Sequence, residues 1–147
     1  MYDTILFATD GSDHATTVAE HAIDAASTRD ATLHVLSVVD DRAFLVLDDE
    51  RVDAVRDDLR TNALEATDEA AARAEEAGLE VETAVETGNP AECIVDHAVD
   101  VDAGLIVMGT SGDDYENNVV GSVSQRVVRT APVPVTTVGP DARSGRR

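Results

Sequence analysis

The sequence contains no lysine: all 11 of its basic residues are arginines, against 30 aspartates and glutamates, which gives a net charge of −19. A surface of this sign repels the phosphates of nucleic acids and the head groups of anionic lipids, so we expect neither nucleic acid nor membrane as a partner. The acids are spread over the predicted helices rather than gathered in a tail. This pattern favours a halophilic protein, because the Debye length in molar salt is about 3 Å and self-repulsion is screened.

Cysteine, aromatic residues and long apolar runs are also scarce. The single cysteine, Cys93, excludes a disulfide within the chain and a cysteine-based zinc site, and the four histidines have no metal-ligand spacing. No apolar run approaches the roughly 20 residues that cross a bilayer, and the N-terminus lacks the basic region of a signal peptide. We therefore expect a soluble, cytoplasmic protein without a metal site. With aromatics at 3%, its core has to be built from Val, Ala, Leu and Ile.

What is present is a regular alternation of short apolar runs and helical patterns. The apolar runs cover residues 4–10, 31–39, 79–86, 104–109 and 133–138, and a segment of helical spacing lies between each pair. The third helix has a clear start, with Asn89 as the N-cap, Pro90 at the first helical position and Glu92 at the third. This order predicts an α/β fold: a three-layer α/β/α sandwich around a five-stranded parallel sheet. We expect one domain over residues 1–139 and a flexible tail over 140–147.

A ligand of such a fold binds outside the carboxyl ends of the strands, where the strand order reverses. One of those ends opens a glycine-rich stretch, "GTSGDDYENNVVGS", which runs from Gly109 to Ser122. Glycines let backbone N–H groups approach phosphate, and the start of the following helix adds further free amides. The same stretch has no cation and three acids, Asp113, Asp114 and Glu116.

Catalytic motifs are excluded by what this stretch lacks. A Walker A loop needs a lysine, which the chain does not have. A nucleophile elbow needs G-x-S-x-G, and no histidine after Ser111 is placed to complete the usual Ser-acid-His order. We predict no catalytic residue. Asp10, at the end of the first strand, is either a ligand contact or simply the residue that opens the next helix.

The chain resembles the universal stress protein family over nearly its whole length, from "ILFATDGSDHA" to "APVPVTTV". Nucleotide-binding members carry G-x2-G-x9-G-(S/T) after a buried fourth strand, and an aspartate at the end of the first strand. Gly109, Gly112, Gly121 and Ser122 match this motif, except that eight residues instead of nine separate Gly112 from Gly121. Asp113 also stands where similar proteins commonly have Arg or Lys.

This resemblance implies an adenine nucleotide alpha hydrolase-like (Rossmann-like) fold and a site for ATP, with or without Mg²⁺ or Mn²⁺. A carboxylate about 4 Å from a phosphate charge costs roughly 1 kcal/mol in water and about 4 at an effective dielectric of 20. Salt or a bridging cation offsets this cost. The residues that the resemblance assigns to the nucleotide come from three strand ends, the glycine-rich stretch and the last helix: Ala8, Thr9, Asp10, Val38, Met108, Gly109, Gly112, Gly121, Ser122, Val123 and Ser124.

Two functions follow from the resemblance. The first is a stress-response regulatory protein that binds ATP or a related adenine nucleotide and is not an enzyme, apart from slow ATP hydrolysis. The alternative is a member that binds no nucleotide and works as a dimeric interaction module. In either case the resemblance implies a homodimer through the last strand, from Val133 to Val138, which is apolar, β-branched and uncharged.

Overall fold

The computed structural model describes residues 3–11, 14–41, 49–110 and 122–139. Strands and helices alternate along the described chain, as the sequence predicts. The predicted tail over residues 140–147 lies outside the described residues. The elements are β1 (Thr4–Ala8), α1 (Ala15–Arg29), β2 (Thr32–Asp40), α2 (Asp49–Glu76), β3 (Val81–Gly88), α3 (Pro90–Asp100), β4 (Leu105–Gly109), α4 (Ser122–Thr130) and β5 (Val135–Val138).

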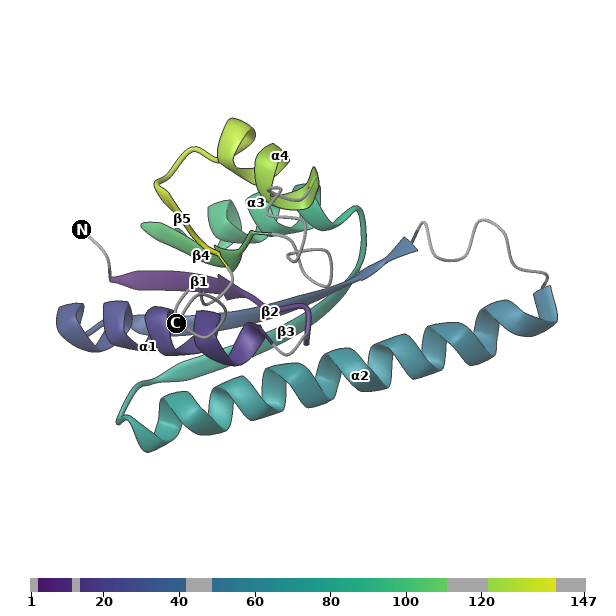
Figure 1. Ribbon diagram of the computed structural model, residues 1–147, viewed down its shortest axis with the longest axis horizontal. Helices are drawn as coiled ribbons and strands as arrows, with labels where there is room; N and C mark the ends of the chain where they lie inside the picture. Colours follow the sequence, from purple (N-terminus) through teal and green to yellow (C-terminus); the bar gives the residue numbers. More distant parts are fainter. Residues whose placement is uncertain (1–2, 12–13, 42–48, 111–121, 140–147) are drawn as a thin grey trace, which may run out of the picture.

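The strands form one parallel sheet in the order β3-β2-β1-β4-β5 (Figure 1). β1 pairs with β2 on one side and with β4 on the other, so that Ile5 is opposite both Leu33 and Leu105. The strand order therefore reverses at β1, and the carboxyl ends of β2, β1 and β4 meet at one edge of the sheet. β3 and β5 are the two outer strands of this sheet.

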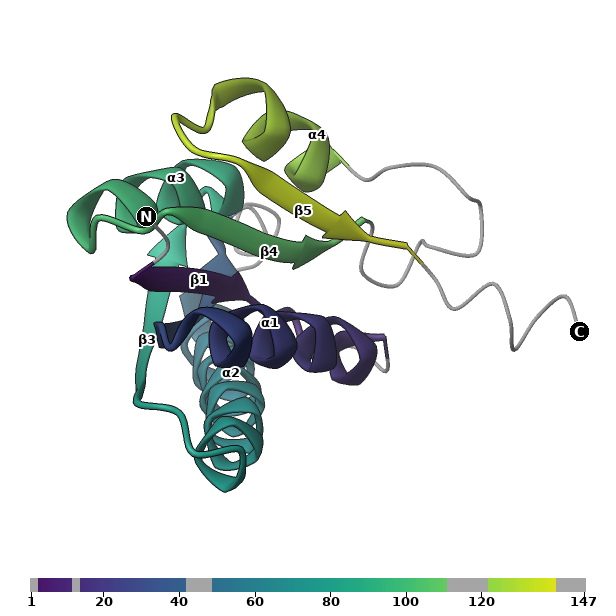
Figure 2. The ribbon, with the colours of Figure 1, turned by 90° about the vertical axis from the view of Figure 1, so that its left-hand side faces the viewer.

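Helices cover both faces of the sheet, which confirms the three-layer architecture. α1 and α2 lie on one side of the sheet and α3 and α4 on the other (Figure 2). Alternate residues of β1 serve the two layers: Phe7 packs into the α1/α2 layer and Leu6 into the α3/α4 layer. Among the described residues, no helix is long and apolar enough to cross a membrane.

Alanine supplies much of the packing between the helices and the sheet. Ala22 and Ala26 of α1 and Ala74 of α2 have no exposed surface at all. These small side chains let helix backbones lie close to the sheet, which is how a chain poor in aromatics reaches dense packing. α2 extends well beyond the body of the sheet at its N-terminal end (Figure 1).

The start of α3 has the predicted cap. The side chain of Asn89 accepts a hydrogen bond of 3.1 Å from the N–H of Glu92, and Pro90 is the first residue of the helix. This bond satisfies one of the N–H groups that a helix leaves open at its start.

Two histidines lie between α3 and the strands β2 and β3. His34 Nε2 is 3.3 Å from a carboxylate oxygen of Glu82, His97 Nδ1 is 2.9 Å from one of Glu86, and the two rings meet edge to face. Burial lowers the pKa of His34, Glu82 opposes that shift, and His97 adds to it. Because its pKa is lowered, His34 is mostly neutral at neutral pH, and its contact with Glu82 is not a full ion pair.

We expect Asn89→Ala to lower the free energy of unfolding by about 1 kcal/mol, because the amide of Glu92 loses its acceptor. Urea denaturation monitored by circular dichroism measures the change. Asn89→Asp is the matched control, since its carboxylate also accepts this bond and should keep wild-type stability. Equal losses in both variants would show that the cap does not stabilise α3.

The histidine pair predicts a pH dependence of stability. Because the pKa of His34 in the folded protein lies below its ordinary value of 6.5, the unfolded chain binds more protons as the pH falls through that value, and stability decreases there. Between about pH 7.5 and about pH 5.5, His34→Gln should therefore lose less stability than the wild type in urea titrations. The exposed His21 provides the control: His21→Gln should follow the wild-type curve.

Candidate functional site

The turn after β1 places Asp10 at the edge of the sheet where the strands end. Thr9 is buried; its N–H donates to the carbonyl of Leu36 at 2.9 Å, and its Oγ1 accepts from the N–H of Gly11 at 3.3 Å. Gly11 has a φ of 75°, in the left-handed region that favours glycine. This turn holds Thr9 in the protein interior and leaves Asp10 exposed at the edge.

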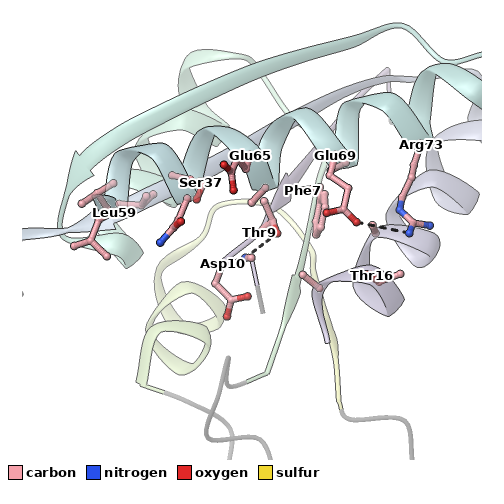
Figure 3. A pocket seen from close by; sticks show the side chains of 18 of the residues that line it. Phe7, Thr9, Asp10, Thr16, Ser37, Leu59, Glu65, Glu69 and Arg73 are labelled. Atoms are coloured by element: carbon pink, nitrogen blue, oxygen red, sulfur yellow. Dashed lines mark hydrogen bonds and ion pairs between the residues drawn. The ribbon is translucent and has the colours of Figure 1, made fainter. Parts of the chain in front are cut away.

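A cleft with a volume of about 540 Å³ opens beside this turn (Figure 3). Its floor is formed by the carboxyl ends of β1 and β2, and its walls by α1 and α2. Three residues that the sequence assigned to the nucleotide line it: Thr9, Asp10 and Val38. A cleft of this size, at the end where strand order reverses, is the default position for a small ligand.

The end of β4 is fastened to β5 and to α1. The N–H of Thr110 donates to the carbonyl of Val138 at 3.1 Å, and the same carbonyl lies 2.9 Å from Nε2 of the buried His14. A side chain at Gly109 would meet Val18 at 3.4 Å and His14 at 3.5 Å. Both are ordinary van der Waals distances, so Gly109 packs directly beside the start of α1; Met108, one residue earlier, is buried.

α4 begins where β4 ends in space. Ser122 is its exposed first residue, and Val123 packs against the core on the α3/α4 face of the sheet. Ser124 is 1% exposed, and its hydroxyl donates to the carbonyl of Thr110. This bond ties the first turn of α4 to the end of β4, so that the N-terminus of the helix lies at the carboxyl edge of the sheet.

The structure thus brings together most of the predicted nucleotide contacts. Six of the described residues lie at the carboxyl ends of three adjacent strands, and the other three lie in the first turn of α4. Gly112 and Gly121 lie outside the described residues, as do Asp113 and Asp114. The predicted nucleotide residues that the structure describes are Ala8, Thr9, Asp10, Val38, Met108, Gly109, Ser122, Val123 and Ser124.

Sequence reasoning missed two features of this edge. One is the role of His14 in fastening β4 and β5, because its partner lies 124 positions along the chain. The other is the contribution of α2, whose Asn62 and Glu65 line the cleft. Asn62 and Glu65 belong to no motif, so only the packing of α2 against β2 could reveal their place in the cleft.

The chemistry of this edge suits binding. It offers the exposed Asp10 carboxylate as an acceptor, strand-end backbone groups beside it, and helix N–H groups that favour an anion. In the part of the chain that the structure describes, no group of three or more His, Cys, Asp or Glu side chains is arranged to hold a metal ion.

Comparison with known proteins gives consistent matches. A relative from Methanocaldococcus jannaschii, universal stress protein MJ0531, is 37% identical over 140 residues, which is 94% of this chain and 82% of the relative. Among solved structures, the protein MJ0577 superposes with a TM-score of 0.84 at 26% identity, with coverage of 96% of this chain and 98% of that one.

Two solved structures of this kind contain adenine nucleotides. A universal stress protein in complex with cAMP is 27% identical, with a TM-score of 0.71 and coverage of 93% of this chain and 97% of its own. The universal stress protein from Archaeoglobus fulgidus in complex with dAMP is 27% identical, with a TM-score of 0.68 and coverage of 92% and 97%.

The model of the universal stress protein family matches residues 1–139, which include every described strand and helix. The matched range, the order of the strands and the position of the glycine motif agree with one another. This chain therefore belongs to the universal stress protein family.

Proposed function

We propose that this protein binds ATP or a related adenine nucleotide at the carboxyl edge of its sheet and acts as a cytoplasmic regulatory protein in a stress response. The observation that carries the proposal is the convergence of Asp10, Val38 and Gly109 at one edge, on three adjacent strands. Similar proteins have been solved with cAMP and with dAMP, which supports an adenine nucleotide as the ligand.

Each group at the edge has a place in this proposal. Asp10 is exposed and accepts a hydrogen bond from a ribose hydroxyl. The backbone of Val38 meets the adenine, and Met108 and Gly109 close the pocket for base and ribose. The first turn of α4, beginning at Ser122, receives phosphate, because an anion is stabilised at a helix N-terminus.

The remaining contacts come from the ends of the glycine motif. In the proposal, Gly112 and Gly121 bring backbone amides to the phosphates. Asp113 and Asp114 are tolerated because molar salt screens them or because Mg²⁺ or Mn²⁺ bridges them to the nucleotide. No general base is assigned, so hydrolysis is slow and the protein functions as a binder.

The first test is calorimetry with ATP in molar KCl that contains Mg²⁺. Asp10→Ala should weaken ATP binding by roughly tenfold, because a hydrogen bond to a charged acceptor is lost. Asp3→Ala is the matched control: Asp3 is also exposed, but it precedes β1 and lies at the opposite edge of the sheet. Its affinity should equal that of the wild type.

Two results would contradict the nucleotide proposal. One is the absence of binding heat with millimolar ATP in the wild type. The other is an equal loss of affinity in both aspartate variants, which would indicate general electrostatics instead of a site at the end of β1.

A second candidate function, a dimeric interaction module, is favoured by the position of β5. It is an outer strand of the sheet, and its only partner among the described strands is β4. The carbonyls of Pro134 and Val138 accept from β4. Because backbone groups alternate in direction along a strand, those of Val135 and Thr137 point away from β4. They form an open edge that can pair with a second copy of the chain.

Thr137→Pro tests this pairing, since it removes an outward N–H and leaves the bonds to β4 in place. The variant should be monomeric under conditions in which the wild type is dimeric, as measured by light scattering. Thr137→Val keeps the N–H and should remain dimeric. A monomeric wild type, or a proline variant that still forms dimers, would rule out pairing through β5.

A further inference from the structure

The side of the cleft that faces α2 has no role in the nucleotide proposal. Met108, Val123 and Val127 pack on the opposite face of the sheet, in the α3/α4 layer. The cleft lies on the α1/α2 face, where Glu65 of α2 stands across from the end of β2 (Figure 3), and Asn62 of α2 also lines it. It adjoins the predicted nucleotide edge through Thr9, Asp10 and Val38, and it extends from there between α1 and α2.

A buried hydroxyl without a partner lines this cleft. Ser37 of β2 is 4% exposed, and its hydroxyl has no hydrogen-bond partner among the residues that the structure describes. Burial of a hydroxyl without a hydrogen bond is costly, so such groups are normally satisfied by protein, water or ligand. Ser37 is therefore the residue that indicates a polar occupant in this space.

The walls of the cleft are formed by small side chains. Ala15 and Ala19 of α1 face Ala63, Ala66 and Ala70 of α2. Larger side chains at these positions would fill the gap between the two helices, which the alanines leave open at about 540 Å³. The lining thus combines these apolar side chains with polar groups at the strand ends and on the two helices.

The charge of the cleft selects the occupant. Four carboxylates line it, from Asp10, Asp40, Glu65 and Glu69, against one guanidinium, that of Arg73. The guanidinium is 3.7 Å from the carboxylate of Glu69 on the same helix. An anion such as phosphate is therefore repelled, whereas a cation is attracted, and the hydroxyl of Ser37 and the amide oxygen of Asn62 accept hydrogen bonds from its N–H groups.

We propose that this cleft is a second binding site, separate from the nucleotide edge, for a small aliphatic ammonium compound. Its ammonium groups contact the carboxylates and the Ser37 hydroxyl, and its methylene chain packs against the alanines of α1 and α2. The site does not require bound nucleotide. Because Thr9, Asp10 and Val38 are shared with the nucleotide edge, occupancy of one site alters affinity at the other, and by the same factor in both directions.

Calorimetry with 1,4-diaminobutane on the full-length protein tests the site, and adipate, a dianion of comparable length, serves as the ligand control. The wild type should bind one equivalent of the diamine and no adipate. Glu65→Gln should weaken diamine binding by roughly tenfold, as expected for loss of a charged partner. Asp68→Asn is its matched control: it removes the same charge from the same helix at a position outside the cleft, and should change affinity less than about twofold.

Two uncharged changes separate the cleft from diffuse attraction to an acidic surface. Ala66→Leu fills the cleft and keeps every charge, so it should abolish binding, and circular dichroism checks that the variant is folded. Ser37→Ala is the smaller change and should weaken binding severalfold while the fold stays intact. Full diamine affinity in both variants, equal losses in Glu65→Gln and Asp68→Asn, or binding of adipate would overturn the proposal.

Discussion

The parallel pairing of β1 with β2 on one side and β4 on the other is the constraint on which the functional edge depends. Each of these strands ends at the same edge, so Asp10, Val38 and Gly109 become neighbours although they are far apart in the sequence. The crossover helices reach opposite faces from this point, which leaves space above the strand ends. The proposed nucleotide contacts at the strand ends follow from this pairing.

The elements that surround that edge are held in place by hydrogen bonds between segments distant in the sequence. The carbonyl of Val138 receives the N–H of Thr110 and contacts His14, while the hydroxyl of Ser124 bonds to the carbonyl of Thr110. These contacts fix the ends of β4 and β5 and the start of α4 and α1 relative to one another. A site made of backbone amides needs such fixing, because its affinity rests on the prior orientation of those groups.

Composition shapes the molecule in a second way. The lack of aromatics makes alanine the main contact between α1, α2 and the sheet, and the same small side chains leave a cleft between the two helices. The acidic excess makes the cleft negatively charged, because Glu65 and Asp40 are among its lining residues. Two properties of the composition therefore act together: the scarcity of aromatics sets the packing and the open cleft, and the acidic excess sets the charge of the proposed second site.

The sequence by itself determined the fold class, the order of the elements and the capped start of α3, because these follow from local periodicity and from residues such as Asn89 and Pro90 that act on their own turn. It also indicated the strand-end residues Asp10 and Val38, since strand ends can be read from the apolar runs. Only the tertiary structure decided the role of His14, the hydrogen bond of Ser124, the exposure of β5 and the α2 wall around Ser37. Those depend on which surfaces meet across the fold, and contacts between residues distant in sequence leave no periodic signal in the chain.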